Sequence, residues 1–515
     1  MNLPPQAWAG QRQWRVLEIG PASGLNFVAA WRAWQGDPQR PAMLHYVLVG
    51  PSQPLADELA AQCRDLQPGF HRLAFEGGRV LLTLCVGDVK SLLREQGFIA
   101  DAVLLGGLDA KALLDRFTAK AIARLCRRGT RIAAPPFPPE ARDHLSQGGF
   151  ALEDSRHGTR GEFAPPWEPR RAPMKTVTQP GRCAVIGGGL AGAAAAASLA
   201  RRGWQVKVLD TALHPASGAS ALPAGLLAPH VSADDNLLSR LVRCGLRISL
   251  QQAHELLHEG SDWQASGVHE QRPGLQAQWH EHAAWIKPAA LVRAWLAQPG
   301  IEWRGGVHVE KLEHGDGGWR LIDARGHKVE RADLVVVAAA QASAALLGGA
   351  LSLEPVRGQV SWAFHSPAQQ LPRSPLNGNG HFIPCVPWRG QTAWLTGSTY
   401  GRGDTSLQAR PQDHQANLER LRALDADVAS QVEPQFSNGE VHAWTGVRCA
   451  GIDRRPLLGE MQPGLWVSTA MGSRGLTFAA LCAELMAARL HGEPLPLPRK
   501  LAATLDAHRR HRTAQ

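Results

Sequence analysis

Three glycines and one acid form the stretch of this chain whose residue types and spacing most clearly indicate chemistry. Gly187, Gly189 and Gly192 are spaced G-x-G-x-x-G, and Asp210 follows 18 residues after the last of them. In a dinucleotide fold the first glycine permits a tight turn, the second lets the backbone approach a pyrophosphate, and the third lets a helix pack close to the sheet. Asp210 can accept hydrogen bonds from a ribose. The spacing predicts a dinucleotide site that also includes Gly188.

A second group of candidate residues lies near the end of the chain. An apolar strand is expected at 465–470, followed by a glycine-flanked turn and a helix over 477–490. Such a turn exposes backbone N–H groups at a helix N-terminus and can sit beside the pyrimidine edge of a flavin. Arg448 is a fixed cation in apolar surroundings, suited to a bidentate grip on a carboxylate, with a structural salt bridge as the alternative. The candidate cofactor residues of the turn are Gly472, Ser473, Arg474, Gly475 and Leu476. A surface or domain-contact arginine is the alternative for Arg474.

The elements that must position these residues can be predicted from hydrophobic patterns. Residues 184–186 and 205–209 are expected strands, with an Ala-rich helix over 193–200 between them. Residues 307–312 and 319–322 alternate like antiparallel strands, and the apolar stretch 332–340 is a strand of the type that returns to the FAD-binding sheet in flavoproteins. We include Val309 of this region, and Ala219 and Ser220 of a small-residue loop, among the FAD-binding candidates. An ordinary loop is the alternative for the last two.

Further strands are expected at 355–361, 394–399 and 441–445, whereas 235–300 is expected to be mainly helical. These strands fit a substrate domain built on a mixed sheet. The predicted class is therefore α/β, with a Rossmann-type FAD-binding domain and a mixed-sheet substrate domain over 183–515. A proline-rich linker is expected over 164–182.

The first 163 residues alternate between expected strands and helices. Strands are predicted at 14–20, 45–49, 80–86 and 102–105, and helices at 25–34, 56–66 and 110–125. Alternation of this kind is typical of a parallel α/β sheet. The glycine-bounded turn after the first strand fits a class I methyltransferase that binds S-adenosylmethionine. The local pattern alone fits other α/β domains equally well.

Composition narrows the class of protein further. Of the 515 residues, 44% are hydrophobic, which supplies large cores for two or three domains. The eight cysteines are scattered without a C-x-x-C pair, so neither a metal site nor a disulfide framework is expected. No signal peptide and no apolar stretch of membrane-spanning length is evident, so we expect a cytoplasmic protein. The net charge of +10 permits an acidic partner such as RNA.

The first half resembles the methyltransferase part of the bifunctional enzymes that build 5-methylaminomethyl-2-thiouridine in tRNA, the MnmC family. The resemblance is carried by Glu18-x-Gly20-x-x-x-Gly24-Leu25-Asn26-Phe27 and by Gly87-Asp88 after the 80–86 strand. It implies that Glu18, Gly20, Gly24 and Asp88 would hold S-adenosylmethionine.

The same half departs from the family at three places. Ala22 replaces the middle glycine of the turn, Gly50 replaces the acid that holds the ribose, and Gly106–Ala110 replaces the Asp-Gly-Phe-Ala-Pro motif. Each lost charge-assisted hydrogen bond removes about 1.5–3 kcal/mol of binding. We hypothesise that this half keeps the fold but has weak or no methyl transfer.

The second half resembles the D-amino-acid-oxidase and glycine-oxidase superfamily, and more closely the FAD-dependent half of the MnmC family. The matching motifs are Arg202–Val206, Gly218–Ser220, Gly446–Ala450, Gly472–Leu476 and Leu481–Glu484.

The resemblance implies oxidative removal of the carboxymethyl group from 5-carboxymethylaminomethyl-(2-thio)uridine, with Arg448 holding the carboxylate. The implied partner is tRNA at its anticodon stem-loop, and neither DNA nor a membrane is expected. Candidate phosphate contacts are Arg127, Arg128, Arg170, Arg171 and the tail 499–512, with solvated surface charges as the alternative for each. Two other functions stay open: oxidation of free glycine, sarcosine or a D-amino acid, and non-catalytic tRNA binding by a flavoprotein.

Overall fold

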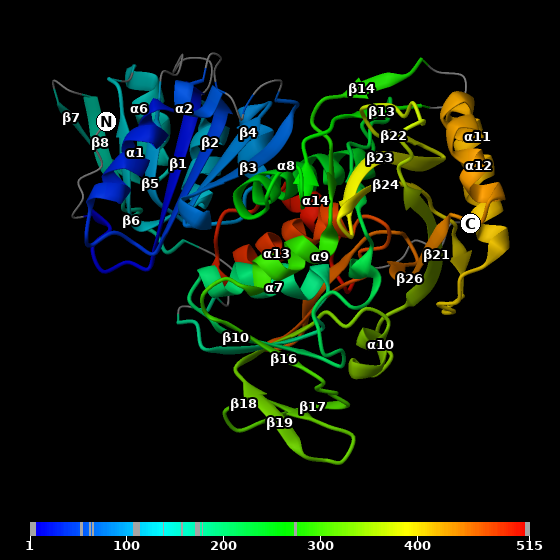
Figure 1. The fold of residues 1–515 in the computed structure, drawn as a ribbon. Coiled ribbons are helices and arrows are strands. Elements are labelled where there is room, and N and C mark those ends of the chain that lie inside the picture. The colour runs from blue at the N-terminus through cyan, green and yellow to red at the C-terminus, as the bar shows by residue number, and fades with distance from the viewer. Residues whose placement is uncertain are drawn as a thin grey trace, which may run out of the picture. The chain divides into compact units, whose positions relative to one another are not determined.

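The computed structural model describes residues 7–51, 55–60, 63, 66–106, 114–136, 138–155, 158–169, 176–177, 179–271 and 276–509. The chain divides into two compact units: Met1–Gln179 with Glu484–Ala503, and Pro180–Ala483 with Thr504–Gln515 (Figure 1). Both units combine helices and sheets, so the predicted α/β class is confirmed. In the described ranges, no helix has the length and apolar character needed to cross a membrane.

An eight-stranded sheet forms the core of the first unit in its described residues. Its strands are β1 (Gln13–Ala22), β2 (Met43–Pro51), β3 (Gly69–Phe75), β4 (Val80–Val86), β5 (Ala100–Leu105), β6 (Cys126–Ala134), β7 (Phe150–Ser155) and β8 (Gly158–Phe163), in the order β3-β4-β2-β1-β5-β6-β8-β7. The accompanying helices are α1 (Leu25–Gly36), α2 (Asp57–Ala60), α3 (Val89–Arg94), α5 (Arg116–Arg124), α6 (Pro139–Gln147) and α14 (Arg499–Ala503). Because β1 runs parallel to both β2 and β5, the strand order reverses at β1. The carboxyl end of β1 is therefore a topological switch point, where ligands bind in such sheets.

A six-stranded sheet carries the glycine motif in the second unit. Its strands are β9 (Arg182–Ile186), β10 (Gln205–Asp210), β16 (Ile301–Gly305), β20 (Leu334–Val337), β27 (Leu457–Gln462) and β28 (Leu465–Thr469), in the order β16-β10-β9-β20-β28-β27. The helices α7 (Leu190–Arg201) and α9 (Pro288–Leu296) cover one face, and β17 (Lys311–Gly315), β18 (Gly318–Ile322) and β19 (Lys328–Ala332) cover the other (Figure 1). Since β9 runs parallel to both β10 and β20, the switch point lies at β9.

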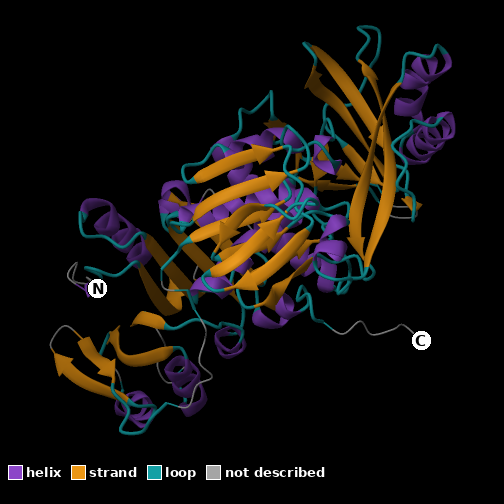
Figure 2. Ribbon diagram, turned by 90° about the horizontal axis from the view of Figure 1, so that it is seen from below, coloured by secondary structure: helices purple, strands orange, loops and turns teal. Residues whose placement is uncertain are grey.

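A larger mixed sheet forms the other half of the second unit. Its strands are β13 (Val268–Glu270), β14 (Gln278–His280), β21 (Leu353–Phe364), β22 (Leu376–Gly378), β23 (Gly380–Trp388), β24 (Gln391–Gly397), β25 (Gly401–Arg402) and β26 (His442–Gly451). The helices α11 (Pro411–Leu424) and α12 (Ala426–Ser437) lie along its outer side (Figure 2). Phe382 and Trp394 of the sheet pack there against Leu418, Leu421 and Val432.

Shorter elements complete the second unit. They are β11 (Gly225–Leu227), β12 (Trp263–Gln264), β15 (Ala284–Ile286), the 3₁₀ turn Ala219–Ala221, and the helices α8 (Leu237–Leu256), α10 (Ala342–Leu346) and α13 (Gly475–His491). The C-terminal part of α13, from Glu484, falls in the first unit.

Several expected elements differ from the structure. The strand expected over 332–340 is limited to β20, and the helix expected at 110–125 begins at Arg116, with 110–113 outside the described ranges. The strand expected at 307–312 begins only at Lys311, because the backbone N–H of Val307 bonds to the carbonyl of Asp210 instead of joining a ladder. The region 235–300 contains β12 to β15 beside the helices α8 and α9. These strands are only two or three residues long, so their sequences show no readable alternation.

Candidate functional site

The turn from β9 into α7 has the geometry of a phosphate-binding loop. Gly187 has φ of +110°, in the region that favours glycine. A Cβ on Gly192 would lie 1.9 Å from the carbonyl oxygen of Gly187, so no larger residue fits. The helix begins at Leu190 without a side-chain cap at Gly189, so the positive end of its dipole favours an anion at this turn.

Two oxygen-bearing side chains lie beside this turn. The Asp210 carboxylate accepts a hydrogen bond from the N–H of Gly188 at 2.6 Å, and Ser220 Oγ accepts from the N–H of Leu190 at 3.1 Å. Ser220 is buried, whereas Ala219 is exposed. An acid for ribose hydroxyls and a hydroxyl at the helix N-terminus are the groups that a dinucleotide such as FAD requires, so the residues present fit that cofactor.

The turn between β28 and α13 lies against the same helix N-terminus. A Cβ on Gly475 would lie 3.1 Å from Leu190, and a Cβ on Gly225 would lie 2.9 Å from Leu476. Gly472 has φ of +58°, and Ser473 is exposed. The structure thus brings together three segments that sequence analysis named separately. Val309 instead packs into the core beneath the sheet.

Arg448 on β26 lies next to this cofactor turn. The N–H of Gly472 donates to the carbonyl of Cys449, the following residue, at 2.8 Å. The guanidinium lies over Gly358 of β21, where a Cβ would come within 2.3 Å of Arg448 Nη1. It donates to Ser398 Oγ at 2.5 Å and to the carbonyl of Thr399 at 3.3 Å.

The charge of Arg448 has no acidic partner in the described part of the chain. Burial lowers the pKa of Arg448, although the group stays a cation because its ordinary pKa is so high. Only two of the five N–H donors of Arg448 meet the oxygens of Ser398 and Thr399. The remaining donors can take a carboxylate, and burial strengthens that ion pair.

His381 is a site residue that the sequence analysis missed. Strand pairing aligns His381 with Gly397, Gly397 with Val360, and Val360 with Trp444, so the side-chain positions share one face of the sheet. Arg448 lies four residues after Trp444 on β26, so its side chain is on the same face of the sheet. His381 Nε2 is buried without a hydrogen-bond partner, and burial, with the charge of Arg448 second, lowers the pKa of His381 to about 4. Only the strand register reveals this residue.

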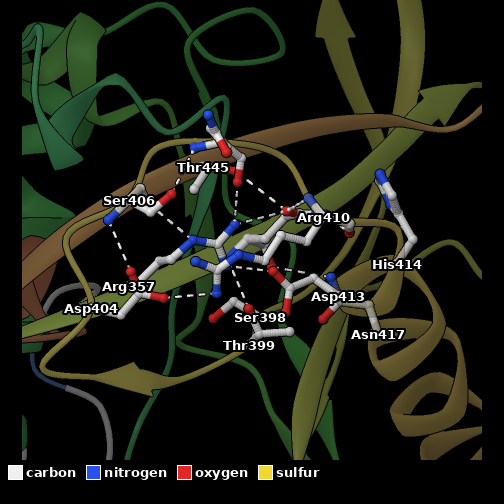
Figure 3. A network of polar contacts seen from close by, with 12 residues as sticks. Arg357, Ser398, Thr399, Asp404, Ser406, Arg410, Asp413, His414, Asn417 and Thr445 are labelled. Carbon is white, nitrogen blue, oxygen red and sulfur yellow. Dashed lines mark hydrogen bonds and ion pairs between the residues drawn. The ribbon is translucent and has the colours of Figure 1, made fainter.

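The segment that holds Arg448 is fixed from the opposite face of the sheet, as Figure 3 shows in part. Gln359 donates its N–H to Thr399 Oγ1 at 3.0 Å, and Arg420 of α11 donates to the carbonyl of Ser398 at 2.5 Å. Buried Arg357 bonds to Asp413. This network stabilises residues 398–400.

The methyltransferase-like candidates lie at the switch point of the first unit. Glu18 is fully buried and accepts hydrogen bonds from Asn26 and Tyr46, both at 2.7 Å. Burial raises the pKa of Glu18. Gly20 and Gly24 have φ of +125° and +86°.

Asp88 is exposed and caps α3 through the N–H of Ser91 at 2.9 Å. Gly50, at φ of +77°, carries no side chain where the family has its ribose acid. Of the altered reaction-site motif 106–110, the residues after Gly106 lie outside the described ranges.

Most of the described candidate RNA contacts form hydrogen bonds or ion pairs with other residues of the protein. Arg127 pairs with Asp101 at 2.7 Å, and Arg128 donates to the carbonyl of Pro165 at 2.7 Å. In the tail, Arg509 donates twice to Asp453. The candidates Arg170, Arg171 and residues 510–512 lie outside the described ranges.

Comparison with known proteins identifies the family of the second unit. Residues 182–270 and 249–489 match the family model of the FAD dependent oxidoreductases. Glycine oxidase from Geobacillus kaustophilus superposes with a TM-score of 0.53 at 20% identity, covering 64% of this chain and 99% of that one. L-proline dehydrogenase from P. horikoshii gives 0.51 at 14% identity, with 64% and 98% covered. The fold and the site therefore define a FAD-dependent oxidoreductase.

Relatives of the whole chain are closer in sequence. The tRNA 5-methylaminomethyl-2-thiouridine biosynthesis bifunctional protein MnmC of Polaromonas sp. (strain JS666) is 47% identical over 97% of this chain and 91% of that protein. The protein of the same name from Ralstonia nicotianae is 33% identical over 99% and 91%. The chain belongs to the MnmC family, as its motifs predicted.

Proposed function

We propose that this protein oxidatively removes the carboxymethyl group from 5-carboxymethylaminomethyl-(2-thio)uridine at the wobble position of tRNA, in the cytoplasm. The products are the 5-aminomethyl nucleoside and glyoxylate. The single observation that carries this proposal is the partly buried guanidinium of Arg448, which has no acidic partner in the described chain and lies beside the cofactor turn. The names of the relatives support the RNA substrate.

The substrate arm is an N-substituted glycine, and the site suits its two ends. Arg448 would hold the carboxylate, which orients the adjacent carbon. FAD, held by the turns at 187–192 and 472–476, would supply the acceptor for the hydride that leaves this carbon. The resulting imine takes up water and releases glyoxylate.

The charges of the site favour the reactive form of the amine. Hydride can leave only when the substrate nitrogen is neutral, and a nearby cation disfavours a second positive charge. Arg448 and Arg474 are both partly buried, and neither has an ion-pair partner in the described residues. His381 is neutral near pH 7, since its pKa is about 4. No protein base is needed.

For the first unit we propose a methyltransferase fold with weak or no methyl transfer. Gly50 offers no carboxylate to the ribose of S-adenosylmethionine, and the carboxylate of Asp88 is used as a helix cap. The family activity that completes the 5-methylaminomethyl group would then require another enzyme.

The test uses purified full-length protein and tRNA that carries the carboxymethylaminomethyl group. The protein should be yellow and release glyoxylate from this tRNA but not from free sarcosine, and mass spectrometry should show the aminomethyl nucleoside. Equal turnover of sarcosine would indicate a small-molecule amine oxidase. A yellow protein without either activity would indicate a non-catalytic RNA-binding flavoprotein.

A further inference from the structure

Tyr400 is an exposed aromatic ring at the proposed substrate site. It lies between β24 and β25, and 59% of its surface is accessible. Its ring centroid is 4.7 Å from Cζ of Arg448, the distance of a cation–π contact. The ring therefore borders the carboxylate site and is open to solvent.

The backbone holds this ring in place. Ser398 and Thr399, the two preceding residues, are each only 6% exposed. Both bond to the Arg448 guanidinium, and Thr399 is also held by the backbone N–H of Gln359 at 3.0 Å. An exposed aromatic side chain on a fixed backbone loses little conformational entropy when a second ring packs on it.

We propose that Tyr400 stacks on the pyrimidine ring of the modified wobble nucleotide. This inference rests on the proposed function. Four bonds separate the carboxylate carbon from the uracil ring, a reach of about 5 Å. A carboxylate bound by Arg448 therefore places the base within contact distance of Tyr400.

Tyr400 thereby distinguishes the RNA substrate, which carries a pyrimidine ring, from free amino acids, which have none. Sarcosine and glycine present the same carboxylate to Arg448 but have no ring to stack. Two cations reinforce a nucleic-acid partner: Arg474 and Arg454 lie close enough to each other that the charge of Arg454, after burial, lowers the pKa of Arg474. Aromatic stacking beside cations is a general mode of binding unpaired bases.

The test compares Tyr400→Ala, Tyr400→Phe and the wild type with two substrates of the same site. Tyr400→Ala should lower kcat/KM for modified tRNA about 10- to 100-fold, the loss of one base–aromatic stack, whereas Tyr400→Phe should stay near wild type. Binding of glycolate, followed by the flavin absorption spectrum, should change less than about threefold, because Ser398 and Thr399 still hold the Arg448 guanidinium. Leu407→Ala, which removes another exposed apolar side chain (66% accessible), is the matched control and should behave as wild type.

Three outcomes would overturn the stacking role. An equal loss of tRNA turnover and glycolate binding in Tyr400→Ala means that the ring only positions Arg448. Unchanged tRNA kinetics in Tyr400→Ala means that no base packs there. A wild-type protein that binds glycolate but releases no glyoxylate from the tRNA removes the proposed function itself, and the stacking role with it.

Discussion

At the scale of single residues, the site depends on one partly buried cation, Arg448. The sequence pointed to Arg448 through its motif, but it could not show that the guanidinium lies over Gly358 or that it has no acidic partner in the described residues. Tyr400 and His381 escaped sequence analysis altogether. Their proximity to Arg448 follows from pairing among β21, β23, β24 and β26, which no local pattern encodes.

Arg448→Ala should raise KM and lower kcat for modified tRNA while the protein stays yellow. Removing one partner of a buried charged pair costs about 2–5 kcal/mol, so kcat/KM should fall at least about 30-fold. Steady-state glyoxylate release and the flavin spectrum measure the two quantities. Arg448→Lys, which keeps the charge but not the forked geometry, should recover part of the activity. Unchanged kinetics in Arg448→Ala would remove this residue from the mechanism.

His381 should make the protein less stable in acid. Its folded pKa of about 4 lies below the ordinary value of 6.5, so the unfolded chain binds the extra proton first. The contribution of the neutral imidazole is present above pH 6.5 and is lost as the pH falls towards 4, by at most about 3 kcal/mol. Thermal unfolding between pH 4 and 7.5 should show a steeper loss for the wild type than for His381→Gln. Parallel curves would contradict the buried, neutral state of His381.

At the scale of elements, glycines shape both the cofactor turn between β9 and α7 and the carboxylate site around Arg448. The sequence predicted the β9–α7 turn correctly, because the three glycines, the helix and the strand follow one another along the chain. No pattern of neighbouring residues marked Gly358 in the sequence. Its role depends on β21 and β26 lying side by side, with Gly358 paired to Gly446 and the Arg448 side chain crossing above.

Two glycine substitutions should therefore fail in different ways. Gly358→Ala places a Cβ 2.3 Å from Arg448 Nη1, so tRNA turnover should fall as in Arg448→Ala while flavin is retained. Gly192→Ala places a Cβ 1.9 Å from the Gly187 carbonyl, so the purified protein should lose its yellow colour. Absorbance at the flavin band and glyoxylate release separate the two defects. Gly315→Ala, with nothing within 4 Å of the added Cβ, is the control. A colourless Gly358→Ala protein would contradict this division.

At the scale of the whole molecule, the C-terminal segment 484–503 belongs with the N-terminal sheet. Gln13 donates to the carbonyl of His491 at 2.9 Å, and Arg72 donates to the carbonyl of Pro494 at 2.7 Å. Lys500 pairs with Glu95 at 3.4 Å. The sequence placed this segment in the oxidoreductase part because the partners lie about 400 residues apart, beyond the reach of any local pattern.

This division decides how methyl transfer should be tested. A fragment ending near residue 179 lacks the acceptors for Gln13 and Arg72, so loss of binding in it would report misfolding rather than a changed site.

Calorimetry with the full-length chain and S-adenosylmethionine should give no saturable heat at micromolar concentration, because Gly50 offers no carboxylate. Gly50→Asp is the matched gain-of-function variant, since aspartate tolerates the positive φ of 77° better than most residues and its Cβ would contact Val89 at 3.3 Å. If the missing acid limits binding, Gly50→Asp should tighten it about tenfold or more. Micromolar affinity of the wild type, together with methyl transfer to aminomethyl-uridine tRNA, would show instead that the first unit is an active methyltransferase.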